Sequence, residues 1–316
     1  MPQRLESLPV IGESSVAELL HWAPLIDSLE AAMIQFSTGH VAQPLRRIIP
    51  VPGRDGFIAA MPAIGEAMAV KIVTLYHSNA GTDLPTHQAV IVVFDKDNGS
   101  PLALMDGRLI TEMRTAAGSA AAIRKLAVTS PAVVTILGSG VQARAHAEAI
   151  ATVRDGYELR IWARNIDHGR ALADEIGAQF FADAEEAVRD ADIVATTTSS
   201  TEPVLRGAWL KAGAFVTAVG WNTSDGRELD DSAMANIVIV ECLDTAHDQA
   251  GNIRGSGCDI YAEIGEVYAG TKIVPPGATV VFDSVGLAIL DATAAKLVYD
   301  SWCEAVPSGY SAPGAD

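Results

Sequence analysis

Short, almost continuous apolar segments alternate with helix-like segments between about residues 130 and 285. The apolar segments are residues 133–137, 159–162, 193–196, 215–219, 237–240 and 280–282. Segments of this length and composition are typical of parallel strands that are buried on both faces of a sheet. Residues 142–154 and 168–176 have the spacing of crossover helices. The alternation therefore predicts a doubly wound α/β sheet.

Residues 1–125 have a different pattern. Helical spacing occurs near 16–36 and 114–126, and alternating apolar segments between them predict strands at 57–61, 69–76 and 89–94. The turn Asp97-Asn98-Gly99, followed by the apolar segment 101–105, predicts a β-hairpin. This part is expected to be an α+β domain with antiparallel strands. A last helix is expected at about 288–302, and the Pro-, Gly- and Ser-containing tail 306–316 is expected to be disordered.

A glycine-rich segment directly follows the strand expected at 133–137. It reads Gly138-Ser139-Gly140-Val141-Gln142-Ala143 and leads into a helix pattern. In a dinucleotide-binding turn of the Rossmann type, the first glycine permits the tight turn, the second lets the backbone approach a pyrophosphate, and the small third residue permits close packing. The helix N-terminus supplies N–H donors to the phosphates. Cofactor contacts are therefore predicted at Gly138, Ser139, Gly140, Val141 and Gln142, with an ordinary βα turn as the alternative.

The end of the second strand of such a sheet distinguishes NAD from NADP. A carboxylate there would accept a hydrogen bond from the ribose 2′-hydroxyl. Here the chain reads Trp162-Ala163-Arg164-Asn165, and the first carboxylate is Asp167. Since an arginine can pair with a 2′-phosphate and stack on adenine, Arg164 favours NADPH over NADH, with dual use left open. Asn165 is included among the predicted cofactor contacts. The alternative is a solvated loop arginine.

The chain is strongly acidic, with 22 Lys and Arg against 39 Asp and Glu and a formal charge of −17. It has no long basic run, so nucleic-acid binding is not expected. No apolar stretch approaches the roughly 20 residues that span a bilayer, and residues 1–6 lack the order of a secretory signal. The three cysteines match neither a disulfide framework nor a metal-ligand spacing, which predicts reduced thiols, a cytoplasmic location and no metal site.

Cations within apolar segments need an explanation in such an acidic chain. Lys71 lies inside the strand expected at 69–76, where alternation places it on the face of Ala69 and Val73. A buried lysine requires a partner or a lowered pKa. Arg46 and Arg114 occur in similar settings, and the three cations together could bind a substrate carboxylate. The alternative is that each pairs with a nearby Asp or Glu.

The order of these segments resembles the ornithine cyclodeaminase/mu-crystallin family, and within it the mu-crystallin-like ketimine reductases more than the cyclodeaminases. The resemblance extends from about residue 43 to residue 302. Its most specific segments are Gln43-Pro44-Leu45-Arg46, Lys71-Ile72-Val73-Thr74, Pro85-Thr86-His87-Gln88, Met105-Asp106-Gly107, Arg114-Thr115-Ala116-Ala117, the glycine turn, Arg227-Glu228-Leu229, Glu263-Ile264-Gly265-Glu266-Val267, Asp283-Ser284-Val285-Gly286 and Ala294-Ala295-Lys296-Leu297.

The resemblance implies a homodimer that pairs through sheets of the first domain, and a C-terminal helix that returns to that domain. We therefore expect a discontinuous substrate-binding and dimerisation domain, residues 1–125 with 288–316, and a Rossmann dinucleotide-binding domain, residues 126–287. It also implies a substrate-carboxylate and catalytic cluster of Arg46, Lys71 and Arg114.

The remaining implied site residues belong to the cofactor. Thr115 resembles a phosphate contact, and the segment from Ser284 to Gly286 resembles a nicotinamide-side contact. Val219, at the end of the fourth strand of the nucleotide domain, is added to this set. Arg164 has the position at which mu-crystallin-like members hold the NADP 2′-phosphate.

The chain departs from the cyclodeaminase pattern at one position. The cyclodeaminases have an aspartate base shortly after the Val-Gly that ends the fourth strand, and by position it falls on Asn222 in this chain. An asparagine amide does not titrate near neutral pH and cannot be that base. Reduction of a ready-made C=N bond needs no such base. The alternative is that Asn222 is only a loop residue and the alignment is shifted.

The resemblance and the cation cluster lead to one functional hypothesis. The protein is expected to reduce a cyclic 2-imino acid, 1-pyrroline-2-carboxylate or 1-piperideine-2-carboxylate, by hydride transfer from NADPH or NADH to C2. Lys71 is the first candidate for the proton donor and His87 the second, although His87 could be structural. The alternatives are an ornithine or lysine cyclodeaminase, alanine-dehydrogenase-like reductive amination, and a non-catalytic protein that binds NADPH or a small ligand.

Overall fold

The computed structural model describes residues 8–220 and 226–305. The expectations for residues 1–6, for Asn222 and for the tail 306–316 concern residues outside these ranges. The chain divides into two compact units. Unit 1 comprises Met1–Arg114 and Leu287–Asp316, and unit 2 comprises Thr115–Gly286.

Unit 1 is built on a six-stranded sheet with the order β1-β6-β5-β4-β3-β2. The strands are β1 (Val10–Ile11), β2 (Arg47–Pro50), β3 (Gly56–Ile64), β4 (Met68–Tyr76), β5 (His87–Phe94) and β6 (Pro101–Asp106). Strands β2 to β6 pair antiparallel in chain order, whereas β1 pairs parallel with β6. The antiparallel strands and the hairpin between β5 and β6 confirm the expected α+β pattern.

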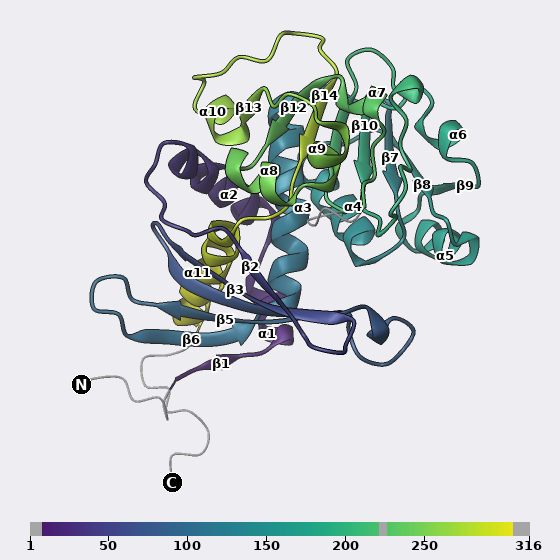
Figure 1. Ribbon diagram of the computed structural model, residues 1–316. Helices are drawn as coiled ribbons and strands as arrows, with labels where there is room; N and C mark the ends of the chain where they lie inside the picture. The colour runs from purple at the N-terminus through teal and green to yellow at the C-terminus, as the bar shows by residue number, and fades with distance from the viewer. Residues whose placement is uncertain (1–7, 221–225, 306–316) are drawn as a thin grey trace. The chain divides into compact units, whose positions relative to one another are not determined.

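Helices cover one face of this sheet. They are α1 (Glu13–Leu19), α2 (Trp22–Ser37) and α11 (Ala288–Ala305), and a short 3₁₀ turn, η2 (His77–Asn79), follows β4. Helix α11 packs against α2 and against β3, β4 and β5 (Figure 1). Alternate residues of the strands point toward α11, and Lys71 is one of them, with only 2% of its surface exposed. The inward side chain therefore follows from the period of the strand.

Unit 2 contains an eight-stranded sheet in which all neighbouring strands are parallel, with the order β13-β12-β14-β11-β10-β7-β8-β9. Its strands are β7 (Val133–Leu137), β8 (Glu158–Trp162), β9 (Gln179–Phe181), β10 (Ile193–Thr196), β11 (Phe215–Ala218), β12 (Ile237–Val240), β13 (Ala262–Glu263) and β14 (Val280–Asp283). The chain order reverses between β7 and β10, which is the switch point of a doubly wound sheet. The predicted Rossmann-type architecture is confirmed.

Short helices connect these strands. They are α4 (Val141–Val153), α5 (Ile166–Ile176), α6 (Ala184–Val188), α7 (Asp231–Met234), α8 (Leu243–Gln249), α9 (Gly251–Ser256) and α10 (Ile264–Tyr268), with the 3₁₀ turn η3 (Gly207–Trp209). Helix α3 (Arg108–Leu126) begins in unit 1 and continues into unit 2. Every residue of β7, β10, β11 and β14 is buried, which explains their continuous apolar sequence. No helix within the described ranges is long and apolar enough to cross a membrane.

Candidate active site

The centre of the candidate site in unit 1 is a buried carboxylate between two buried cations. Asp291, in the first turn of α11, lies with its Oδ2 2.8 Å from Nζ of Lys71. Its Oδ1 accepts a hydrogen bond from Nε of Arg114 at 3.0 Å. Lys71 also donates to Oγ1 of Thr111 at 3.2 Å. Arg114 and Thr111 come from α3 and Lys71 from β4, so three separate elements meet at this cluster.

The neighbouring charges fix the protonation state of the cluster at neutral pH. Burial lowers the pKa of Lys71 to about 8, assisted by Arg114 and Arg46, while Asp291 opposes this shift. Burial would raise the pKa of Asp291, but the charges of Arg114 and Lys71 and their hydrogen bonds hold it below its usual value. At pH 7 the cluster therefore contains a protonated Lys71 and an ionised Asp291.

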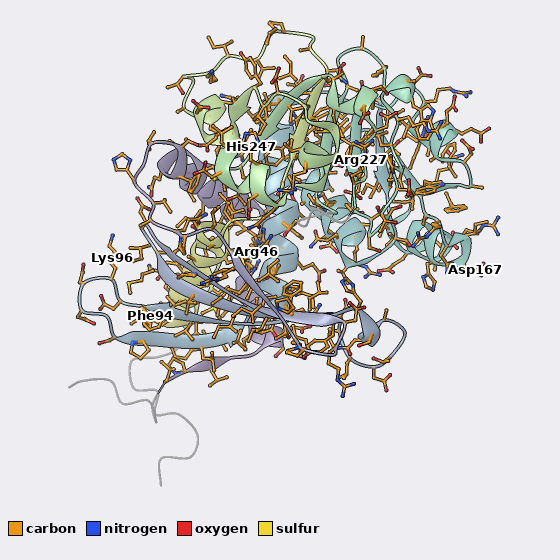
Figure 2. All side chains as sticks on the ribbon, in the orientation of Figure 1. Arg46, Phe94, Lys96, Asp167, Arg227 and His247 are labelled. Carbon is orange, nitrogen blue, oxygen red and sulfur yellow. The ribbon has the colours of Figure 1, made fainter. Side chains whose placement is uncertain are left out.

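His87 and Arg46 lie within electrostatic range of this cluster. Burial lowers the pKa of His87, at the start of β5, to about 4, and the charges of Lys71 and Arg114 contribute to the shift. His87 is therefore neutral at pH 7. Arg46 is half-buried on the segment that leads into β2 (Figure 2), and its charge lowers the pKa of Lys71. The structure thus brings together all four residues that the sequence predicted for catalysis.

The cluster has more positive than negative charge. Lys71 and Arg114 both contact one carboxylate, that of Asp291, and the charge of Arg46 also acts on Lys71. Lys71 has three N–H donors; Nζ donates one hydrogen bond, to Thr111, and forms an ion pair with Asp291. Arg114 contacts Asp291 through Nε, and its two Nη groups have no hydrogen-bond partner within residues 8–220 and 226–305. A carboxylate ligand would supply the missing negative charge and the missing acceptors.

In unit 2, the glycine turn has the backbone geometry that a phosphate site requires. Gly138 has a φ of 137°, and a Cβ atom there would lie 2.9 Å from the carbonyl oxygen of Thr197. Gly140 is the N-cap of α4, and a Cβ atom there would meet nothing within 4 Å. Ala143 is fully buried, so α4 packs closely on the sheet. A phosphate can therefore approach the backbone at Gly140 and the N–H groups that begin α4.

The residues after β8 are exposed. Arg164 is exposed, so its side chain is accessible to a 2′-phosphate. Asn165 is the N-cap of α5 and accepts a hydrogen bond from the N–H of His168 at 3.1 Å. Asp167 follows in the first turn of α5, at the surface in Figure 2. Asn165 thus has a structural role that is independent of a cofactor.

Two buried glutamates hold the turns at the carboxyl ends of the parallel strands. Oε1 of Glu228 accepts hydrogen bonds from the backbone N–H of Thr198 at 2.5 Å and from its hydroxyl at 2.8 Å. Oε2 accepts from Thr196 Oγ1 and from the N–H of Gly220, each at 2.8 Å. The N–H of Val219, the next residue back, donates to Thr196 O at 3.1 Å. Glu228 therefore joins the ends of β10 and β11.

Glu241 holds the turn after β14 in the same way. Its carboxylate accepts hydrogen bonds from Ser284 Oγ at 2.8 Å, from the N–H of Val285 at 3.1 Å and from the N–H of Gly286 at 2.7 Å. Ser284 and Gly286 are two of the predicted nicotinamide-side contacts, so their placement depends on a residue that the sequence did not reveal. Burial raises the pKa of the nearby Asp283 to about 8, and this carboxyl group is therefore mostly protonated at pH 7.

Thr115 is half-buried on α3, the residue after Arg114. The same helix carries Ser119, which belongs to a buried chain of hydrogen bonds in unit 2. His146 Nδ1 lies 2.8 Å from Gln142 O, so this nitrogen carries the hydrogen, and Nε2 lies 2.9 Å from Ser119 Oγ. Ser119 Oγ lies 2.9 Å from Thr217 Oγ1. Burial lowers the pKa of His146 to about 4, so it is neutral and braces the glycine turn at Gln142.

The two units define a class of protein: one unit has a dinucleotide-type sheet with a glycine turn before α4, and the other has two buried cations that share one carboxylate. The chain belongs to the ornithine cyclodeaminase/mu-crystallin family, whose model matches residues 10–305. The resemblance inferred from the sequence motifs is confirmed.

Three relatives illustrate the similarity. Ketimine reductase mu-crystallin of Mus musculus is 42% identical over 287 residues, which cover 88% of this chain and 92% of the relative. The structure of Thermococcus litoralis Delta(1)-pyrroline-2-carboxylate reductase in complex with NADH and L-proline is similar with a TM-score of 0.88, at 33% identity, and covers 94% of this chain and 98% of that one. An archaeal alanine dehydrogenase dimer with bound NAD also has a TM-score of 0.88, at 27% identity, and covers 94% and 96%.

Proposed function

We propose that this protein reduces a cyclic 2-imino acid, 1-pyrroline-2-carboxylate or 1-piperideine-2-carboxylate, to the cyclic amino acid with NADPH or NADH. The observation that carries the proposal is the pair of buried cations in unit 1, Lys71 and Arg114, which share the single carboxylate of Asp291. The two reductases among the similar proteins support the same substrate class, since one is a ketimine reductase and the other is bound to NADH and L-proline.

The substrate carboxylate is the natural ligand for the unused donors of the cluster. The two Nη groups of Arg114 form a planar fork that matches a carboxylate, because the contact to Asp291 uses only Nε. Arg46 adds a second positive charge to the same region. Such a double contact fixes the orientation of a small ring as well as its position, which is a main source of rate in hydride transfer.

The cofactor residues lie in unit 2. The glycine turn from Gly138 to Gln142 would bind the pyrophosphate, Thr115 would add a phosphate contact, and the segment from Ser284 to Gly286, together with Val219, would contact the nicotinamide end. Bound NAD(P)H supplies the hydride that reduces C2 of the imine. The exposed Arg164 and the lack of a carboxylate in residues 163–166, directly after β8, favour NADPH over NADH.

Lys71 is the proton donor in this proposal. Reduction of C=N to CH–NH requires one hydride at carbon and one proton at nitrogen, and a protonated imine is the better hydride acceptor. Lys71 has a pKa of about 8, so it carries a proton at pH 7, and Nζ donates a hydrogen bond to Thr111 alone among the described residues. His87 has a pKa of about 4 and is already neutral at that pH. Lys71 is therefore better matched to the task than His87.

We also propose a homodimer that forms through the outer face of the six-stranded sheet. Ile58, Ile72 and Val90 point away from the helices of unit 1, and 41%, 39% and 43% of their surfaces are exposed. Ile72 is paired with Val90 on the next strand, so the apolar side chains are contiguous. An apolar sheet face of this kind is typical of an interface. The dimeric archaeal alanine dehydrogenase among the similar structures supports this assembly.

The proposed dimer can be tested with one charged substitution. Ile72→Lys should convert a dimer into a monomer in sedimentation velocity, because the new charge would be buried without a partner at the interface. Ile273→Lys is the matched control, since Ile273 is 76% exposed in unit 2 and lies outside this sheet. A wild-type monomer, or an Ile72→Lys dimer of unchanged stability, would refute the proposed interface.

We propose that the enzyme is cytoplasmic. Cys242, Cys258 and Cys303 form no disulfide bonds with one another, although Cys303 is exposed. Unpaired thiols are typical of reducing compartments. Fractionation of the cells that produce the protein, with activity measured in each fraction, tests this location.

The activity itself is tested with a panel of substrates. The wild-type protein should oxidise NADPH, and more slowly NADH, in the presence of 1-pyrroline-2-carboxylate or 1-piperideine-2-carboxylate. Pyruvate with ammonia tests reductive amination, and L-ornithine with NAD tests cyclodeamination through ammonia release. Oxidation with pyruvate and ammonia alone would replace the proposed activity by an alanine-dehydrogenase-like one. Cofactor binding without turnover of any substrate would indicate a binding protein.

A further inference from the structure

Asp291 lies at the centre of the unit 1 cluster, and the proposed chemistry does not use it directly. We propose that Asp291 is a positioning residue, which orients Lys71 and Arg114 toward the substrate and keeps Lys71 protonated at neutral pH. The kinetic consequences of this inference rest on the proposed reduction of an imine. The effect of Asp291 on the protonation of Lys71, however, can be measured without any substrate.

The fold holds Asp291 in place through the start of α11. The backbone N–H of Ile289 donates to Oε1 of Gln43 at 2.9 Å, so a side chain from a distant segment caps the helix. The first N–H groups of a helix have no partner within the helix, and a cap therefore stabilises its first turn. Asp291 belongs to that turn, where the positive end of the helix dipole favours a carboxylate. Gln43 begins the segment that ends with Arg46.

Each oxygen of the carboxylate contacts a different cation. Oδ1 accepts from Nε of Arg114 at 3.0 Å, and Oδ2 lies 2.8 Å from Nζ of Lys71. The contact at Nε sets the plane of the guanidinium group and leaves both Nη groups for a ligand. Thr111 donates its hydroxyl hydrogen to Gly107 O at 2.7 Å and therefore accepts from Lys71. This hydrogen bond and the ion pair hold Nζ of Lys71 between Thr111 and Asp291.

The charges around Lys71 show why its proton depends on Asp291. The groups that act on it are Asp291 from α11, Arg114 from α3, Arg46 before β2 and, from β5, the neutral His87. Asp291 alone among them carries a negative charge. Burial, Arg114 and Arg46 all favour the neutral amine, and Asp291 alone favours the ammonium form. Without this carboxylate, Lys71 would lose its proton at a lower pH.

The main test is the Asp291→Asn variant of the full-length protein. The asparagine oxygen can still accept from Nε of Arg114, and its amide can donate to a neutral Lys71 amine, so both side chains keep a hydrogen-bond partner in the variant. The alkaline limb of kcat/KM for reduction of 1-pyrroline-2-carboxylate should move to lower pH by about 1 to 3 units. Asp291→Glu should restore the limb to within half a unit of wild type, because it restores the charge.

A second measurement reports on Lys71 itself. Trace labelling with acetic anhydride over a pH series, followed by mass spectrometry of the Lys71 peptide, gives the pKa of the amine in the absence of substrate and cofactor. The pKa should fall in Asp291→Asn and should be retained in Asp291→Glu. Asp300→Asn is the matched control, because Asp300 is an exposed residue of the same helix that pairs with Lys296. Asp300→Asn should change neither the pH dependence of Lys71 labelling nor the alkaline limb of kcat/KM.

The outcomes separate the two proposals. If the wild-type protein reduces no cyclic imine but Asp291→Asn lowers the pKa of Lys71, the proposed function is wrong and the role of Asp291 stands. If Asp291→Asn is less active but retains the wild-type alkaline limb and labelling curve, Asp291 does not set the charge of Lys71 and the inference is overturned. If Asp291→Asn does not fold, a displaced labelling curve in Asp291→Glu would likewise overturn it.

Discussion

The two units of this protein bury charges of opposite sign, and they satisfy these charges by different means. In unit 1, the cations Lys71 and Arg114 share a single carboxylate and retain N–H donors that no described residue uses. In unit 2, the carboxylates of Glu228 and Glu241 accept hydrogen bonds mainly from backbone N–H groups and hydroxyls of the adjoining turns. In unit 1, two buried cations contact one carboxylate, so the positive charge exceeds the negative charge beside it. In unit 2, the carboxylate of Glu228 accepts hydrogen bonds from several N–H and O–H groups.

This contrast shows how buried charges that serve a ligand differ from those that serve the fold. A carboxylate that accepts several local hydrogen bonds stabilises the turns that donate them, and its removal should primarily affect stability. A cation cluster with unused donors retains the capacity to bind an anion, and its removal should primarily affect turnover. The following variants test this distinction from the largest expected effect to the smallest.

Lys71→Met should have the largest effect on turnover. It removes the proposed proton donor, while Asp291 keeps its ion pair with Arg114, so the fold should be retained. We expect kcat for imine reduction to fall by about 10²- to 10⁴-fold, measured as NADPH oxidation at saturating substrate. Lys296→Met, which removes an exposed lysine of α11, is the control and should have nearly wild-type kcat. Equal kcat values in the two variants would assign no catalytic role to Lys71.

Glu228→Gln should lower stability more than it affects substrate binding. The amide nitrogen of glutamine would face hydrogen-bond donors now bound by a carboxylate oxygen, and we expect the free energy of unfolding to fall by about 2 to 4 kcal/mol. Denaturant titration of the folded protein measures this loss. Glu175→Gln, which removes an exposed partner of Arg144, should cost much less. A loss of activity with unchanged stability would instead place Glu228 among the functional residues.

Arg164→Ala should separate the two cofactors. Loss of a charged contact to the 2′-phosphate should raise KM for NADPH by about 10- to 100-fold. KM for NADH, which lacks this phosphate, should change little, and steady-state kinetics with each cofactor measures the difference. Arg170→Ala, at another exposed arginine of α5, is the control. A parallel rise of both KM values would show that Arg164 does not discriminate between the cofactors.

Asp283→Asn should have an effect on stability that is small at pH 5 and grows with pH. The folded protein keeps the proton of Asp283 up to about pH 8, whereas the unfolded chain releases it near pH 4, so folding becomes less favourable as pH rises between these values. Asparagine has no such proton and can still accept from Asn252.

The stability of Asp283→Asn relative to wild type should therefore increase by up to about 1.4 kcal/mol per pH unit between pH 5 and pH 8. Denaturant titrations of both proteins at several pH values measure this slope. A constant difference over the range would mean that Asp283 is ionised in the folded protein.

The strand pattern could be predicted from the sequence wherever a strand was long enough to display its period. The buried strands β7, β10, β11 and β14 were identifiable from continuous apolar segments, and the inward position of Lys71 followed from the alternation in β4. The edge strands β9 and β13, with three and two residues, were not predicted. A segment of two or three residues is too short for periodicity to distinguish a strand from a loop.

The partners of the buried charges could not be predicted in the same way. Asp291 lies 177 positions after Arg114 in the chain and looks, in the sequence, like one polar residue of an amphipathic helix. Glu241 likewise follows a buried strand with no sign that it accepts hydrogen bonds from residues 284–286. The sequence indicated only that Lys71 and Arg114, in their apolar context, required negatively charged partners, because burial of an unpaired charge is costly.

The sequence by itself determined the doubly wound sheet, the glycine turn after β7 and the inward position of Lys71, because these depend on local periodicity and on the chemistry of individual side chains. Only the tertiary structure decided which carboxylate faces those cations, that His87 is neutral while Lys71 keeps its proton, and that glutamates hold the turns after β10, β11 and β14. These properties depend on distances between residues far apart in the chain and on the exclusion of water, and the packing of the folded chain sets both.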